Sequence, residues 1–122
     1  MENEGFLVLQ NVPGYDQDEL LKWQKWFYAL PKAERESLAI AHLARDGKHH
    51  PNTYRGFAPF LNNDVSHKEM FEIGLDYDQV SEEEKLCPLH EYTPWPKSED
   101  GKADEFKRFM NNYYQAMSNV GQ

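Results

Sequence analysis

Two aromatic-rich runs, separated by a turn, constrain the fold of this chain more than any other feature. The runs cover residues 52–60 and 67–75. Residues 61–64 lie between them and read Leu-Asn-Asn-Asp, in which the Asn and Asp side chains favour a turn by bonding to their own backbone. The second run alternates, so one face of a strand would carry Glu69, Phe71, Ile73 and Leu75. The pattern predicts two strands whose apolar face packs against a helix or another sheet.

Amphipathic helices are predicted on both sides of this strand pair. Asp16 can cap a helix that runs to about residue 30, and Glu19 three positions later makes a variant of the capping box. Its apolar stripe consists of Leu20, Trp23, Phe27 and Leu30. The clearest pattern covers residues 103–120, where Gly121 suits the end of the helix. The apolar positions of this helix are Phe106, Phe109, Met110, Tyr113, Met117 and Val120.

The remaining segments complete an α+β domain. Residues 6–12 form a nearly continuous apolar run before Pro13-Gly14 and predict a strand that is buried on both faces. Residues 32–45 predict a second helix, because Pro31 suits a helix start and Asp46-Gly47 would end it. The acidic residues 76–85 predict a solvated turn and a short helix. Residues 86–96 contain three prolines and should run extended.

Composition limits the partners and the compartment. The chain has 122 residues, enough for one domain, with 13 basic and 21 acidic residues and a net charge of −8. This charge argues against binding to nucleic acid or to anionic membranes. No apolar run approaches the ~20 residues that span a bilayer. A single cysteine, Cys87, permits no internal disulfide, so we expect a reducing, cytoplasmic setting.

Several short motifs carry a resemblance to a known family. Tyr54-Arg55-Gly56-Phe57 is followed by Lys68-Glu69-x-Phe71-x-Ile73-Gly74, and the other matching pieces are residues 5–11, Leu30-Pro31, Trp95-Pro96, Phe106 and Tyr113-Tyr114. In this order they resemble the N-terminal region of the non-haem iron(II), 2-oxoglutarate-dependent dioxygenases of the isopenicillin N synthase type. The resemblance covers about residues 5–121.

The resemblance implies that residues 1–122 are a single N-terminal region, truncated at both ends. In that family such α+β regions brace and cap a catalytic double-stranded β-helix, or jelly roll, which is absent here and would be the partner of this chain. A full-length enzyme would use Fe(II), 2-oxoglutarate and oxygen to oxidise a small molecule. We expect no activity from this chain alone. The alternative is a standalone, non-enzymatic interaction module that binds through open strand edges.

The metal and co-substrate motifs of the family are missing. Its iron site needs His-x-Asp or His-x-Glu and a distant His, and Arg-x-Ser holds the 2-oxoglutarate. Only His67-Lys68-Glu69 has the first spacing, but it aligns with a different element; His90 is too close to be the distant ligand, and no Arg-x-Ser follows. We therefore expect no catalytic, metal-binding or cofactor-binding residue in this chain.

The sequence context also indicates roles for one arginine, three histidines and the cysteine. By the resemblance Arg55 is a candidate substrate-facing residue, and the alternative is a structural salt bridge with an acid such as Glu69. The loop pair His49-His50 is expected to be solvated, and His42 to lie on a helix surface. Cys87 is interpreted as a buried or inert thiol.

Overall fold

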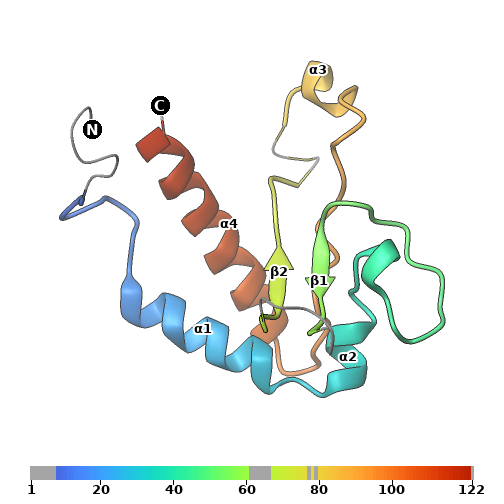
Figure 1. Ribbon diagram of the computed structural model, residues 1–122. Coiled ribbons are helices and arrows are strands. Elements are labelled where there is room, and N and C mark those ends of the chain that lie inside the picture. Colours follow the sequence, from blue (N-terminus) through green and yellow to red (C-terminus); the bar gives the residue numbers. More distant parts are fainter. Residues whose placement is uncertain (1–7, 61–66, 77, 79, 122) are drawn as a thin grey trace.

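The computed structural model describes residues 8–60, 67–76, 78 and 80–121, and shows an α+β fold (Figure 1). Two strands form an antiparallel sheet, and the two longer helices lie on the same side of it. Along the chain the elements are α1 (Gln17–Ala29), α2 (Lys32–Glu36), the 3-10 helix η1 (Ala41–Leu43), β1 (Gly56–Ala58), β2 (Met70–Glu72), α3 (Glu82–Lys85) and α4 (Lys102–Gly121).

Phe27 of α1 lies at the centre of the core. Its ring centroid lies 4.5 Å from that of Phe71 on β2, 5.6 Å from that of Phe106 on α4 and 6.2 Å from that of Phe57 on β1. Phe57 and Phe71 are directly opposite each other in the sheet, so their side chains share one face. The apolar stripes predicted for α1 and α4 therefore pack on the face of β2 that was predicted to be apolar.

The start of α1 is as predicted, but the capping box is only half formed. The Asp16 carboxylate accepts a hydrogen bond from the backbone N–H of Glu19 at 3.0 Å. The Glu19 carboxylate does not return this contact to the backbone of Asp16. It accepts instead from Lys22 Nζ at 2.9 Å and from Trp23 Nε1 at 3.0 Å. The side chain that was expected to cap the helix thus fixes the indole of Trp23.

The helix predicted for residues 32–45 is wrong beyond α2. After Glu36 the chain becomes extended beside β1: Phe57 N–H donates to the Leu38 carbonyl at 2.8 Å, and Ile40 N–H donates to the Phe57 carbonyl at 3.0 Å. This pairing buries residues 38–40, so tertiary contacts override the local helical preference. It also explains Gly56, where a Cβ would lie 2.4 Å from the Leu38 carbonyl oxygen.

The strand predicted for residues 6–12 is absent from its described part. Residues 8–12 have no strand structure, and the side chains of Val8 and Leu9 are 80% and 51% exposed. Phe6 and Leu7 lie outside the described residues, as does the turn predicted at residues 61–64. The antiparallel pairing on either side of that turn is confirmed.

The C-terminal half of the chain follows most of the predictions. Ser81 caps α3 with a complete capping box, residues 86–96 contain no helix or strand, and α4 covers the predicted range. Gly121 is the last residue of α4 instead of following it. Asp76 was expected to be solvated, but it is only 2% exposed, because its carboxylate pairs with Lys107 Nζ at 2.9 Å.

Candidate functional site

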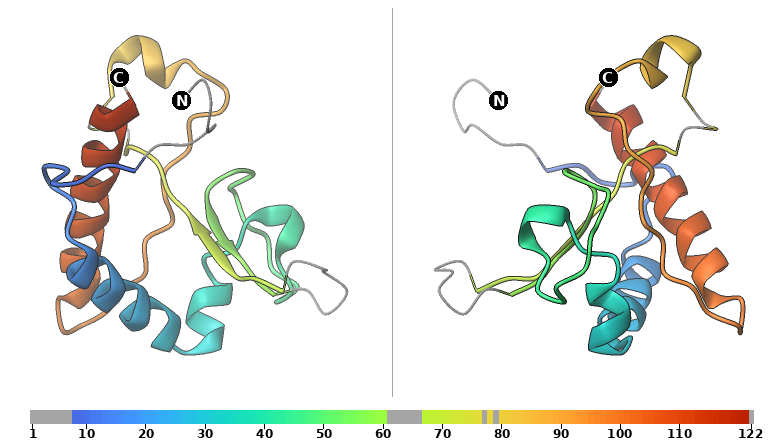
Figure 2. Two further views of the ribbon diagram at one scale, coloured as in Figure 1. Left: turned by 60° about the vertical axis from the view of Figure 1, so that its left-hand side comes forward. Right: turned by 90° about the vertical axis from the view of Figure 1, so that its right-hand side faces the viewer.

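A densely hydrogen-bonded polar cluster joins the start of β1 to the coil at residue 91. The carboxylate of Glu91 accepts hydrogen bonds from three consecutive backbone N–H groups, those of Thr53 at 2.7 Å, Tyr54 at 2.9 Å and Arg55 at 3.0 Å. We call these four residues the Glu91 clamp. The coil runs beside the sheet (Figure 2). The three hydrogen bonds of the clamp fasten it to the start of β1, although the two segments are far apart in sequence.

Arg55 connects a third segment to the clamp. Its Nη1 donates to the carbonyl of Leu75 at 2.7 Å and to the carbonyl of Glu91. The guanidinium lies directly over Gly74, where an added Cβ would be 2.4 Å from Arg55 Cζ. The side chain that was the candidate substrate-facing group therefore contacts main-chain oxygens on two segments.

The salt bridge proposed between Arg55 and Glu69 is wrong. Glu69 pairs with Arg35, whose Nη1 lies 2.6 Å from Glu69 Oε2. Arg35 comes from the end of α2, and its guanidinium also lies over the ring of Phe57, 5.4 Å from the centroid. Sequence spacing did not indicate this pairing, because it depends on where α2 ends.

The clamp lowers the pKa of its own carboxyl group. Burial raises the pKa of Glu91, but the backbone N–H groups of Thr53, Tyr54 and Arg55 and the charge of Arg55 outweigh that effect. The pKa of Glu91 therefore lies below its ordinary value of 4.5. At neutral pH the clamp holds a carboxylate that is fully charged.

Large apolar side chains are exposed on the segments that the clamp joins. Tyr54 is 53% exposed and Tyr92 is 59% exposed, and the Asn52 side chain ties the second segment further by donating to the Tyr92 carbonyl at 2.6 Å. Leu86 and Leu89, just before the clamp, are 83% and 57% exposed. We call Tyr54, Leu86, Leu89 and Tyr92 the apolar clamp surface.

The histidines and the cysteine do not all lie where they were expected. His50 is buried, and its Nε2 lies 2.9 Å from Asp46 Oδ1, so the expectation of a solvated pair is wrong for this residue. His49 and His42 are exposed, the latter on η1. Cys87 is exposed, so it is not a buried thiol.

His67 and Glu69, the one pair with the spacing of the family's metal motif, are engaged separately. The His67 ring stacks on Phe60 with a centroid distance of 5.5 Å, whereas Glu69 pairs with Arg35. Across the ranges that the structure describes, no group of three His, Cys, Asp or Glu side chains is placed to hold a metal ion.

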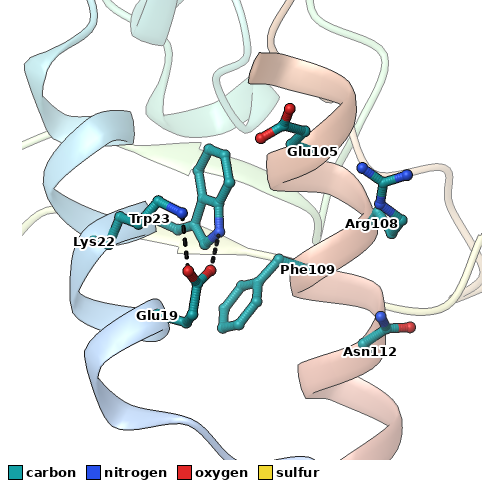
Figure 3. A pocket seen from close by; sticks show the side chains of 7 residues that line it. All are labelled: Glu19, Lys22, Trp23, Glu105, Arg108, Phe109 and Asn112. Atoms are coloured by element: carbon teal, nitrogen blue, oxygen red, sulfur yellow. Dashed lines mark hydrogen bonds and ion pairs between the residues drawn. The ribbon is translucent and has the colours of Figure 1, made fainter. Parts of the chain in front are cut away.

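A hollow of about 250 Å³ lies between α1 and α4 (Figure 3). Its lining combines Trp23 and Phe109 with a polar rim, which consists of the charged residues Glu19, Lys22, Glu105 and Arg108 and the neutral Asn112. Trp23 is only 4% exposed, and the Glu19 carboxylate already accepts from Lys22 and from the indole. The hollow therefore offers a ligand mainly solvated charges, whose pairwise contributions are small.

Glu91 is the residue that sequence reasoning missed. It stands alone in a coil between prolines, and its three donors lie 36 to 38 positions earlier. No local motif connects the two segments.

Within the described residues no helix is long and apolar enough to cross a membrane. Compared with known proteins, the chain matches no family model, no curated protein and no solved structure.

Proposed function

We propose that this chain is the N-terminal scaffold and cap portion of an Fe(II)/2-oxoglutarate-dependent oxygenase that acts on a small molecule, and that it is catalytically incomplete by itself. The apolar clamp surface supports this proposal most. Tyr54 and Tyr92 remain more than half exposed although the backbone that carries them is firmly hydrogen-bonded. Exposed apolar side chains on an ordered support are typical of an interface.

The proposed partner is a C-terminal catalytic β-helix domain. A domain that docks on the apolar clamp surface would cover Leu86, Leu89 and both tyrosines. Aromatic residues at such a position contribute strongly to an interface, because they bury a large area with few rotatable bonds. Arg55 helps to hold the backbone next to Tyr54 and Tyr92 in place, because its guanidinium donates to the carbonyls of Leu75 and Glu91.

Iron would be held by the catalytic domain and not by this chain. The geometry of His67 and Glu69 does not fit a shared metal ion, because the carboxylate is committed to Arg35 at 2.6 Å and the imidazole to the ring of Phe60. The two histidines, the carboxylate and the basic residue that anchors 2-oxoglutarate would all come from the partner domain. The contribution of this chain is to brace and cover that site.

The first test combines sequence and activity. The coding sequence beyond Gln122 should continue into His-x-Asp, a later His and Arg-x-Ser. The longer protein should release succinate from 2-oxoglutarate when Fe(II) is present, and the 122 residues alone should not. A stop codon directly after Gln122 would instead support a standalone interaction module. Iron-dependent succinate release by the 122 residues would overturn the proposal.

The second test addresses the docking surface. The catalytic part, expressed separately, should co-purify with this chain, and Tyr54→Asp with Tyr92→Asp should abolish that association. Leu21→Asp is a matched control, because Leu21 is an exposed apolar residue on α1, at 42% exposure. Equal loss of association in the control and in the tyrosine variant would contradict docking at the apolar clamp surface.

A further inference from the structure

One edge of β2 presents backbone groups that can pair with another strand. The N–H and the carbonyl of Phe57 both bond to residues 38–40, so Phe57 and Phe71 form a non-hydrogen-bonded pair of the β1–β2 ladder. The N–H and the carbonyl of Phe71 consequently point away from β1, and so do those of Glu69, two positions earlier. Among the described residues, the only hydrogen bond to these four groups comes from the Tyr28 hydroxyl, which donates to the Glu69 carbonyl at 3.3 Å. An additional strand would find both donors and acceptors here.

The face of β2 that points away from the core carries two opposite charges. Lys68 and Glu72 are exposed on this face, and the half-buried Met70 lies between them. Within the part of the chain that the structure describes, neither charged side chain has a salt bridge or a hydrogen bond. They are too far apart to pair with each other, because four residues of extended chain span about 13 Å. A strand placed beside β2 could supply a partner to each of them.

The order of these side chains makes β2 complementary to a second copy of itself. In an antiparallel pair with a two-fold axis at Met70, Lys68 of each copy lies opposite Glu72 of the other. The two methionines meet between these ion pairs. Moving the axis by one residue, to Phe71, takes the charges out of opposition, and moving it to Glu72 places two like charges opposite each other, which is unfavourable. The charges therefore select the axis at Met70.

The same register pairs the open backbone groups. With the axis at Met70, Phe71 of each copy lies opposite Glu69 of the other, and these are the two residues whose N–H and carbonyl groups point away from β1. The Glu69 carbonyl can accept the new bond together with that of Tyr28, because a carbonyl oxygen has two lone pairs. Side chains and backbone thus favour one and the same register.

We propose that two copies of this chain associate by antiparallel pairing of β2 with β2, with the two-fold axis at Met70. The pairing joins the two-stranded sheets of both copies into one sheet of four strands. It also covers an edge that is otherwise available for pairing with other chains. The dimer uses none of the residues of the apolar clamp surface and does not depend on the oxygenase role.

Charge reversal in the whole chain tests the register. The wild type should form a concentration-dependent dimer in analytical ultracentrifugation. Lys68→Glu or Glu72→Lys alone should raise the dissociation constant of the dimer by about tenfold or more, because like charges then lie opposite each other. An equimolar mixture of the two variants should form heterodimers of nearly wild-type strength, since every opposed pair again has unlike charges. Lys97→Glu is the control, because it makes the same change of charge at an exposed residue outside β2.

Four results of this experiment would overturn the proposal. They are a wild type that stays monomeric, a dimer that neither reversal weakens, a mixture that does not restore association, and a control variant, Lys97→Glu, that weakens the dimer as much as Lys68→Glu does.

A disulfide between copies gives an independent readout of the axis. In a Cys87→Ser background, Met70→Cys should form a cross-linked dimer on mild oxidation, because opposite residues of a non-hydrogen-bonded pair have Cα atoms about 4.5 Å apart. Glu72→Cys in the same background is the control. Its two copies would lie four residues apart along the paired strands, which is beyond the reach of a disulfide. Equal cross-linking at both positions, or none at position 70, would contradict the axis at Met70.

Discussion

Arg55 and Glu91 contact each other in two places: the backbone N–H of Arg55 donates to the Glu91 carboxylate at 3.0 Å, and the Arg55 guanidinium donates to the Glu91 carbonyl. Each residue thus orients the other, and the pair joins the start of β1 to a coil that has no secondary structure of its own. The order of that coil, and of the tyrosines beside it, depends on these contacts.

Replacing Glu91 by Gln should destabilise the fold by about 1–3 kcal/mol, because one carboxylate oxygen that accepts from backbone N–H groups becomes an NH₂ donor. Chemical denaturation at pH 7 measures the change in the free energy of unfolding. Glu83→Gln is the control, since Glu83 is exposed on α3, and it should stay within about 0.5 kcal/mol of the wild type. Equal effects of the two substitutions would show that the clamp contributes nothing.

The contribution of Glu91 should depend on pH in a defined direction. Its pKa in the folded protein lies below the ordinary 4.5, so the folded state favours the carboxylate. The resulting stabilisation is fully present above the unfolded pKa and is lost as the pH falls through the folded pKa. Urea denaturation at several pH values should therefore show the wild type and Glu91→Gln converging below pH 4.5. A stability difference that does not change with pH would contradict this assignment.

Gly74→Ala should destabilise the protein through Arg55. The new methyl group would lie 2.4 Å from Arg55 Cζ, and the guanidinium can move only by giving up its bonds to Leu75 and Glu91. We expect a loss of about 1–3 kcal/mol, the usual range for overpacking. Gly121→Ala is the control, because no atom lies within 4 Å of its added Cβ.

A double-mutant cycle separates this clash from a general backbone effect. In an Arg55→Ala background the guanidinium is gone, so adding Gly74→Ala should have little further effect on the free energy of unfolding. If Gly74→Ala is equally destabilising in both backgrounds, the contact between the two positions is not the cause.

Local patterns in the sequence predicted the helices and strands that are marked by a capping residue or by apolar residues at a regular helical or strand spacing. The cap at Asp16, the stripe around Phe27 and the range of α4 all follow from spacing within a few turns of helix. The strand pair was also predicted, because alternation identifies the face that carries Phe71.

The features that the sequence did not predict depend on contacts between distant segments. Residues 38–40 have the composition of a helix but extend to bond with Phe57, which lies 17 to 19 positions later. Asp76 begins an acidic stretch in which Asp78 and residues 81–84 are exposed, yet Asp76 is buried and its carboxylate contacts Lys107 and Trp95. The Glu91 clamp also depends on contacts between distant segments, since no residue near Glu91 in the sequence indicates which backbone N–H groups it binds.

Lys107→Met should destabilise the fold, because it leaves the buried carboxylate of Asp76 without its cationic partner. Asp76 is 2% exposed, and without the Lys107 ammonium its carboxylate would retain the Trp95 indole N–H at 3.2 Å. Because Lys107 is 42% exposed, we expect a loss of about 1–3 kcal/mol, less than for a fully buried pair. Thermal and urea denaturation provide the measurement. The matched control is Lys102→Met at the first residue of α4, which removes an exposed ion pair with the preceding Asp100 and should change stability by less than about 1 kcal/mol. Losses of the same size at both lysines would mean that burial of Asp76 adds nothing to the pair.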